Sequence, residues 1–138
     1  GRHFGMEDCT GDLSRLTAIA GVGKGQFGVM QAVQEQLLSA LVCGSTGACA
    51  TASNVYPSLY RRLYDTFQAG DIQKAYELQG TMRTLLDMYK ASGGSKHVLN
   101  RLGLPISTAT RHMREITEKQ ARATDMLVAF VEKGLTEV

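Results

Sequence analysis

The chain has 138 residues, of which 43% are hydrophobic and 20% charged, and this composition fits one folded domain and argues against disorder. Its 15 basic and 13 acidic side chains are scattered, so no basic stripe predicts a nucleic-acid partner. The longest apolar run, residues 37–42, is too short to span a membrane, so we expect no membrane partner. Three cysteines, two of them in apolar runs, predict reduced and buried thiols in a cytoplasmic protein.

The first part of the chain alternates predicted strands and helices. A short apolar run predicts a strand over residues 4–8, and the turn and cap residues 9–12 precede a predicted helix over 13–20. Residues 21–25 then predict a loop, and residues 27–33 predict a second strand.

The clearest α/β unit follows the second strand. A predicted helix over 35–43 ends at Gly44, and the small residues 48–52 predict an inner strand. Pro57 suits the first turn of the next helix, over 57–68, because its missing N–H costs nothing there. A strand flanked by helices on both sides is typical of a parallel α/β sheet.

In the last part of the chain the strand signal disappears. Apolar residues at helical spacing predict a long helix over 71–91, a short helix ending at Gly103 and a final helix after Thr117. We therefore expect two domains, residues 1–69 with the sheet and residues 70–138 with helices alone.

Two phosphate-binding patterns occur without the structural context that they need. Residues 23–28 match G-x-G-x-x-G, but a helix precedes them and a strand follows, which is the reverse of a dinucleotide fingerprint. Lys24 is followed by Gly25 and not by the Ser or Thr of a phosphate loop. We expect a connector at this position.

The histidines and hydroxyl residues predict no cofactor chemistry. His3, His97 and His112 are scattered, with no second histidine or cysteine at i+3 or i+4 and only Glu115 as a possible neighbour of His112, so no metal site is predicted. No serine, cysteine or threonine stands in a nucleophile elbow. We expect neither a metal nor a cofactor.

Polar groups follow the predicted strands at their carboxyl ends, the edge where α/β barrels place active sites. They are Glu7 and Asp8 after the first strand, Gln34 and Glu35 after the second, and residues 51–54 after the third. Each can also cap a helix, because carboxylates are favoured near helix N-termini, and both interpretations stay open. Three parallel strands with helices on one side also leave two unpaired edges that something must cover.

Several motifs, in order along the chain, are similar to one known family. They are Gly-Met-Glu-Asp-Cys-Thr-Gly-Asp-Leu at residues 5–13, Glu-Gln-Leu-Leu-Ser-Ala-Leu at 35–41, Gly-Ser-Thr-Gly-Ala at 44–48, Ala-Ser-Asn-Val-Tyr-Pro at 52–57 and Ala-Gly-Asp-Ile at 69–72. Together they resemble the C-terminal half of the N-acetylneuraminate lyase and dihydrodipicolinate synthase family of Schiff-base aldolases. The resemblance implies an α/β fold, namely the last three units of a (β/α)8 TIM barrel followed by a C-terminal helical appendage.

The resemblance also implies a mechanism, from which this chain departs. In the family, a lysine two residues after the glycine that matches Gly5 forms an imine with pyruvate or another 2-keto acid. This chain has Glu7 at that position, and a carboxylate cannot form an imine. Lys24 is predicted at the opposite mouth of the barrel, roughly 15 Å away for a five-residue strand, so we expect no catalytic residue in this chain.

The resemblance assigns substrate contacts to the ends of the second and third strands. Ala32, Gln34 and Glu35 correspond to the family's Gly-x-Asp-Glu, and only the glutamate matches. A second set, Cys49, Ala50 and Thr51, stands where the lyases have an aliphatic residue, a glycine and a serine, so only the hydroxyl is kept.

Two functions from different classes follow from these observations. The favoured one is a fragment or degenerate member of the pyruvate-dependent aldolases, closest to N-acetylneuraminate lyase-like or dihydrodipicolinate synthase-like enzymes and inactive alone. The alternative is a non-catalytic interaction module that pairs with itself or with a complementary N-terminal half barrel. The resemblance further implies a homo-oligomer and a small 2-keto acid as the ligand.

Overall fold

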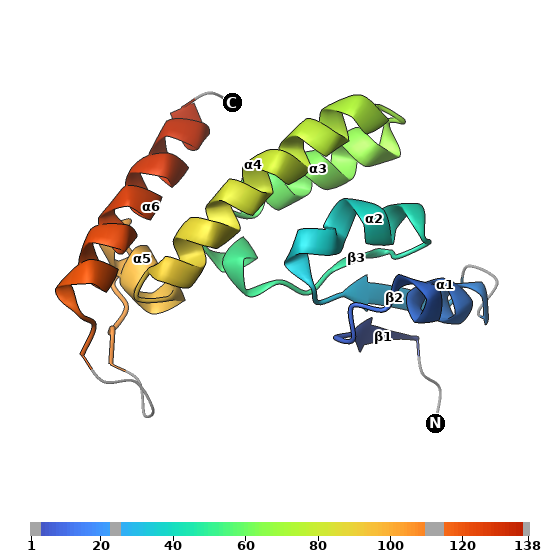
Figure 1. Cartoon of the computed structure of the whole chain (residues 1–138), viewed down its shortest axis with the longest axis horizontal. Helices are drawn as coiled ribbons and strands as arrows, with labels where there is room; N and C mark the ends of the chain where they lie inside the picture. Colours follow the sequence, from blue (N-terminus) through green and yellow to red (C-terminus); the bar gives the residue numbers. More distant parts are fainter. Residues whose placement is uncertain (1–3, 23–25, 110–114, 137–138) are drawn as a thin grey trace. The chain divides into compact units, whose positions relative to one another are not determined.

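A three-stranded parallel sheet forms the first part of the molecule. The computed structural model describes residues 4–22, 26–109 and 115–136. Strands β1 (Gly5–Asp8), β2 (Gly28–Gln31) and β3 (Gly47–Ala48) lie side by side in the order β1-β2-β3 and run in the same direction (Figure 1). The expected parallel arrangement of the three strands is therefore confirmed, and each strand is shorter than its predicted range.

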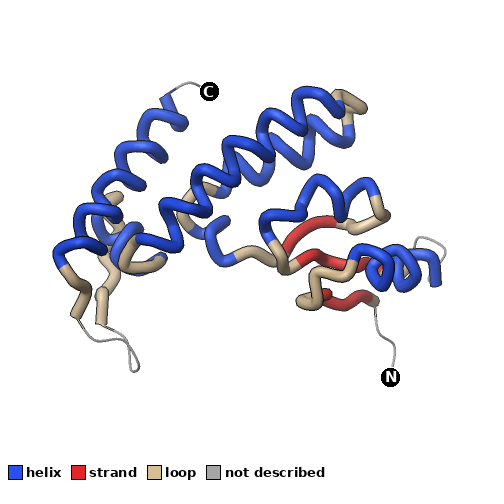
Figure 2. Tube along the Cα trace, viewed as in Figure 1, coloured by secondary structure: helices blue, strands red, loops and turns tan. Residues whose placement is uncertain are grey.

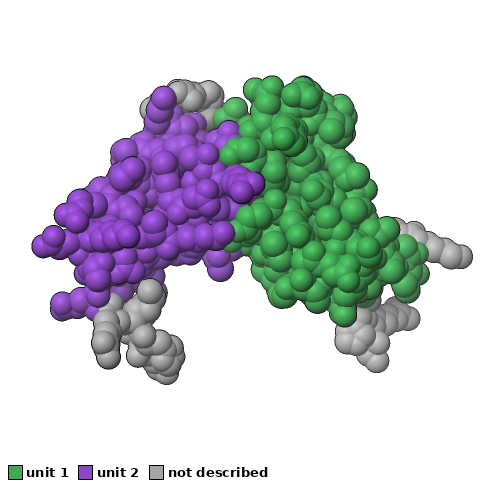
Figure 3. Space-filling model, in the orientation of Figure 1, with its two compact units in different colours: residues 1–50, 59–80 green, residues 51–58, 81–138 purple. Residues whose placement is uncertain are grey.

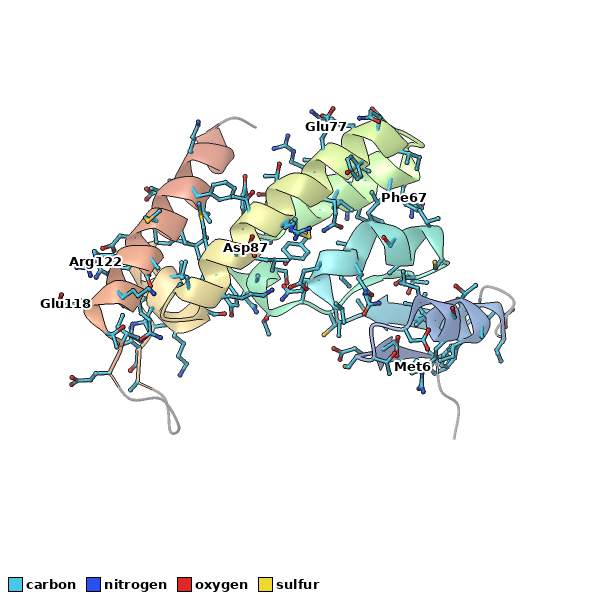
Figure 4. The ribbon with its side chains drawn as sticks, viewed as in Figure 1. Met6, Phe67, Glu77, Asp87, Glu118 and Arg122 are labelled. Carbon is cyan, nitrogen blue, oxygen red and sulfur yellow. The ribbon has the colours of Figure 1, made fainter. Side chains whose placement is uncertain are left out.

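Helices α1 (Leu13–Val22) and α2 (Leu37–Val42) pack against one face of this sheet. Their core contains Leu16 from α1, Val29 from β2 and Ala40 from α2, all three fully buried. Met6 of β1, labelled in Figure 4, packs against this cluster. The opposite face, which we call the open face, carries Glu7 and Met30; both side chains are exposed.

An aspartate cap starts α1 and a glycine ends α2, at the positions that the sequence predicts. Asp12 Oδ1 accepts from the backbone N–H groups of Ser14 and Arg15, at 2.9 and 3.0 Å, and so caps the start of α1. Gly44, at φ 96°, ends α2, because its N–H donates to Leu41 and the next N–H, of Ser45, donates to Ala40.

The third predicted strand is wrong at its carboxyl end. Residues 48–52 were expected to be extended, but β3 contains only Gly47–Ala48, and a 3-10 helix, η2 (Thr51–Asn54), follows. The side chain of Asn54 donates to the Thr51 carbonyl at 2.9 Å, and the N–H of Val55 donates to Ala52. Short polar side chains compete in this way with a strand ladder, so the chain turns where small residues alone predicted a strand.

The remaining elements are helices, as Figure 2 shows by colour. They are α3 (Pro57–Gln68), α4 (Ile72–Ala91), α5 (Ser95–Arg101) and α6 (Glu118–Thr136). Gly70 ends α3 at φ 83°, and Asp71 Oδ1 accepts from Lys74 N at 2.9 Å to cap α4. None of these described helices is long and apolar enough to cross a membrane.

The contacts divide the chain into two compact units (Figure 3). The first unit contains residues 1–50 and 59–80, and the second contains residues 51–58 and 81–138. The sheet belongs to the first unit, and so does the N-terminal half of α4. The expected domain boundary between residues 69 and 70 stays a prediction.

The second unit is a helical cluster held by specific contacts. Thr124 of α6 is almost fully buried, and its hydroxyl accepts from the N–H of Gly93 at 3.0 Å. Thr117 and Gln120 cap the start of α6 reciprocally, at 3.0 and 3.3 Å. The ring of Tyr56 meets that of Phe130 edge to face, with centroids 6.5 Å apart.

Two helical glycines should respond in opposite directions to the same substitution. A Cβ at Gly134 of α6 would collide with the hydroxyl of the buried Tyr56, whereas a Cβ at Gly80 of α4 meets nothing within 4 Å. We expect Gly134→Ala to lower the free energy of unfolding by about 1–3 kcal/mol. The matched control Gly80→Ala should raise it by up to about 1 kcal/mol. Urea denaturation measures both, and a Gly134→Ala protein as stable as the parent would contradict the packing of α6.

Candidate functional site

The carboxyl ends of the three strands meet at one edge of the sheet, because the strands are parallel. Beyond the strands, the N–H of Ala32 donates to the carbonyl of Asp8 and the N–H of Cys49 donates to that of Gln31, both at 3.0 Å. These bonds continue the register in which Asp8 pairs with Gln31 and Gln31 with Ala48. The predicted site residues at positions 32 and 49 therefore lie along this edge, which we call the carboxyl edge.

Strand alternation decides which side chains can reach a ligand at the carboxyl edge. Asp8 and Gln31, which pair in register, are 1% and 0% exposed on the helix-covered face. Glu7 and Met30, which also pair in register, lie on the open face, and Met30 is 40% exposed. Because side chains two residues apart in an extended chain share a face, the side chains on the open face are the ones that solvent can reach.

Asp8, one of the two carboxylates predicted after the first strand, has a structural role. Its two carboxylate oxygens accept from the hydroxyl of Thr10, each at 3.0 Å. Arg15 of α1 approaches the same carboxylate at 3.6 Å. This buried group therefore fixes the turn between β1 and α1, which favours the structural interpretation of Asp8 over a ligand contact.

Glu7 forms a cluster with two thiols, those of Cys9 and Cys49. Repulsion by the Glu7 carboxylate is the largest cause that raises the pKa of Cys49, followed by partial desolvation and a hydrogen bond to Glu7. Desolvation is the largest cause that raises the pKa of Cys9, and Glu7 again adds repulsion and a hydrogen bond. Both thiols are therefore protonated near neutral pH, and Glu7 is the acceptor that they share.

The cysteines also correct one prediction from the sequence. Cys9 and Cys49 are exposed and Cys43 is half-buried, so the expectation of buried thiols is wrong. Small apolar neighbours predicted burial, but the open face exposes Cys49 whatever its neighbours in sequence are. Cys9 was missed as a member of the site, although its position two residues after Glu7 was the available signal.

After the second strand, the predicted site residues lie in the 3-10 helix η1 (Gln34–Gln36). The Gln34 side chain accepts a hydrogen bond from the Tyr60 hydroxyl at 2.6 Å. Glu35, in the first turn of η1, is exposed. This turn therefore carries polar groups, as the sequence predicts. One of them, the Gln34 side chain, is hydrogen-bonded to Tyr60 of α3.

After the third strand, the predicted residues fall into different units. Cys49 and the half-buried Ala50 belong to the first unit with Glu7, whereas Thr51 begins η2 and belongs to the second unit. The structure therefore groups Glu7 with Cys49 and the added Cys9, and it aligns Ala32 with them along the carboxyl edge.

Other residues singled out in the sequence give no site in the described part of the chain. His3, Lys24 and His112 lie outside the described residues, as does the start of the G-x-G-x-x-G match. His97 lies half-buried in α5. Within residues 4–22, 26–109 and 115–136, no group of three His, Cys, Asp or Glu side chains could hold a metal ion. The carboxyl edge can thus offer hydrogen bonds and a proton acceptor, and none of its described residues carries an amine.

Comparison with known proteins identifies related chains. The profile of the Dihydrodipicolinate synthetase family matches residues 3–130. The chain is 32% identical over 140 residues to a 4-hydroxy-tetrahydrodipicolinate synthase from Novosphingobium aromaticivorans, a match that covers 98% of this chain and 46% of that protein. The chain spans less than half the length of the curated relatives that it matches.

Solved structures show the same fold at lower identity. A catalytic lysine mutant of the Ruminococcus gnavus sialic acid aldolase has a TM-score of 0.88 at 14% identity, over 97% of this chain and 46% of that one. YagE, an E. coli K12 prophage protein of the dihydrodipicolinic acid synthase family solved with pyruvate, has a TM-score of 0.74 at 21% identity, over 94% and 45%. The expected α/β fold, a partial barrel of three β/α units followed by helices, is confirmed.

Removing the charge of Glu7 should make the two neighbouring thiols more reactive. Glu7→Gln takes away the repulsion that raises the pKa of both Cys9 and Cys49, so the thiolate fraction at pH 8 should rise about tenfold for each unit by which the pKa falls. Because a less basic thiolate is also a weaker nucleophile, the iodoacetamide rate should rise by roughly the square root of that factor. The exposed Glu77→Gln on α4 is the control, and equal rates in the two variants would contradict the cluster.

Proposed function

The chain belongs to the dihydrodipicolinate synthetase family, and from this premise we propose that it supplies the last three β/α units of a 2-keto acid aldolase barrel and forms no imine by itself. The observation that carries the proposal is the position of Glu7. Its side chain lies on the open face of β1, one residue before the strand ends, where an imine-forming lysine of such a barrel would have to reach substrate.

The chemistry of the carboxylate supports the inactive state. An imine needs a nitrogen nucleophile that can lose two protons, and a carboxylate has none. The thiols beside Glu7 do not replace the amine, because sulfur adds to a ketone without forming an imine, and their raised pKa also keeps them protonated near neutral pH. The sialic acid aldolase to which the fold is similar has a catalytic lysine, which is the group that this cluster lacks.

The ligand that we propose for the edge is a 2-keto acid held without a covalent bond. YagE was solved with pyruvate, and Ala32, Glu35, Cys49 and Ala50 are the residues of the first unit that we propose as contacts. Gln34, whose side-chain oxygen accepts from Tyr60, is proposed to support this turn as well as to approach the ligand. We propose that this binding takes place in the cytoplasm, within a homo-oligomer or an assembled barrel.

Borohydride trapping tests the role of position 7 directly. The unsubstituted chain, incubated with labelled pyruvate and reduced with borohydride, should retain no label above the background of its surface lysines, because no amine lies where the imine would form. Glu7→Lys should retain label above the background of surface lysines. Mass spectrometry of the digested protein locates the adduct.

A second lysine variant controls for non-specific labelling. Ser14→Lys places an amine on the exposed surface of α1, away from the open face. Labelling of Ser14→Lys as strongly as Glu7→Lys would remove position 7 from the proposed site. A stable adduct on the unsubstituted chain would overturn the proposed inactivity.

The second candidate function is an interaction module, and the edges of the sheet favour it. Within the described residues, β1 and β3 each pair on one side only. Phe4, 78% exposed, lies directly before β1, and Met30, 40% exposed, lies on the open face. Unpaired strand edges beside exposed apolar side chains favour association with another chain.

Light scattering of the intact chain tests this alternative. If the open face pairs with a second copy, the mass should exceed that of a monomer and increase with concentration, and Met30→Lys should lower it. Met126→Lys is the control, because Met126 is 62% exposed on α6 in the other unit. A monomer at all concentrations with a single cooperative melting transition would contradict self-association.

A further inference from the structure

The turn that carries Gln34 and Glu35 joins two short helices, η1 and α2. η1 begins after Val33 and α2 begins after Gln36, and neither cap residue makes a side-chain cap hydrogen bond. The first N–H groups of a helix have no partner within the helix and must find one elsewhere. The position of this turn therefore depends on groups that come from other elements.

Gln79 of α4 provides a hydrogen-bond partner for the start of α2, although it lies 41 residues after Leu38 in the sequence. Its side-chain oxygen accepts from the backbone N–H of Leu38, in the first turn of α2, at 2.9 Å. Its side-chain nitrogen reaches the carbonyl of Gln34 at 3.5 Å, the same carbonyl that accepts from Leu37 N. One amide thus contacts the main chain on both sides of the junction between η1 and α2.

A second contact restrains the side chain of the same turn. The hydroxyl of Tyr60, which is 8% exposed on α3, donates to Gln34 Oε1 at 2.6 Å. The two helices that follow the sheet in sequence therefore both contact Gln34, one at its side chain and the other at its carbonyl.

We propose that Gln79 is a positioning residue for the ligand contacts at this turn, and that it acts through the main chain of Gln34 and Leu38. The inference rests on the proposed function, because it takes Glu35 and Gln34 to approach a 2-keto acid. It adds that the helical part of the chain takes part in forming the site. Gln79 does not touch the ligand. Its effect is to fix the position of the turn relative to the carboxyl edge.

Amide hydrogen exchange in the intact chain, labelled with ¹⁵N, provides the first test. In Gln79→Leu the amide of Leu38 should exchange roughly threefold to tenfold faster, since it loses one hydrogen bond. Leu41, buried in the same helix, serves as the internal reference. Gln73→Leu, at an exposed position of α4, is the matched control and should leave Leu38 unchanged.

Rescue by a conservative variant separates positioning from general stability. Gln79→Glu keeps an oxygen that accepts from Leu38 N, and its charge is favourable near a helix start, so it should restore the slow exchange. Exchange at Leu38 that is equally fast in Gln79→Leu and Gln73→Leu, or that Gln79→Glu fails to slow, would overturn the inference.

Titration with pyruvate distinguishes the inference from the proposed function. In the unsubstituted chain pyruvate should shift the amide resonances of Gln34 and Glu35, and in Gln79→Leu its apparent Kd should rise several-fold with little change in Tm. No shift in the unsubstituted chain would overturn the proposed ligand, and the Leu38 exchange would still decide the role of Gln79. An unchanged Kd in Gln79→Leu would overturn the positioning role.

Discussion

The constraint on which the structure depends is the parallel register of β1, β2 and β3. It brings three strand ends to one edge, and strand alternation then assigns neighbouring residues to opposite faces. The side chain of Asp8 lies beneath the helices and contacts Thr10 and Arg15. The side chain of Glu7, one residue earlier, lies on the open face. A shift of register by one residue would exchange these two carboxylates and bury the wrong one.

The first unit covers only one face of its sheet, and this asymmetry connects stability with function. Leu16, Val29 and Ala40 form a buried core between the sheet and its helices, so that face is shielded from solvent. The open face presents Glu7, Met30 and Cys49 to solvent in this chain. Parallel sheets are normally covered on both faces, and a barrel satisfies that rule by turning the second face inward, which is the arrangement of the chains that share this fold.

Local signals in the sequence predicted most of the elements, because their causes are local. Glycine and aspartate at Gly44, Gly70 and Asp71 end or start helices through their own backbone or carboxylate, and the sequence shows this directly. The end of β3 was missed because the hydrogen bond of Asn54 to Thr51 competes with pairing across the sheet. Exposure of the thiols was missed because it depends on the sheet face and not on apolar neighbours. The contacts of Gln79 could not be predicted, since its partners lie 41 and 45 positions away.

The exposed thioether of Met30 makes the open face sensitive to oxidation. A methionine that solvent peroxide can reach converts to a polar sulfoxide, whereas one enclosed by packed side chains reacts slowly. Met30 is 40% exposed in the centre of the sheet, so any chain that covers this face would shield its sulfur. The fraction of sulfoxide at this residue therefore records how much of its lifetime the protein spends with the sheet uncovered.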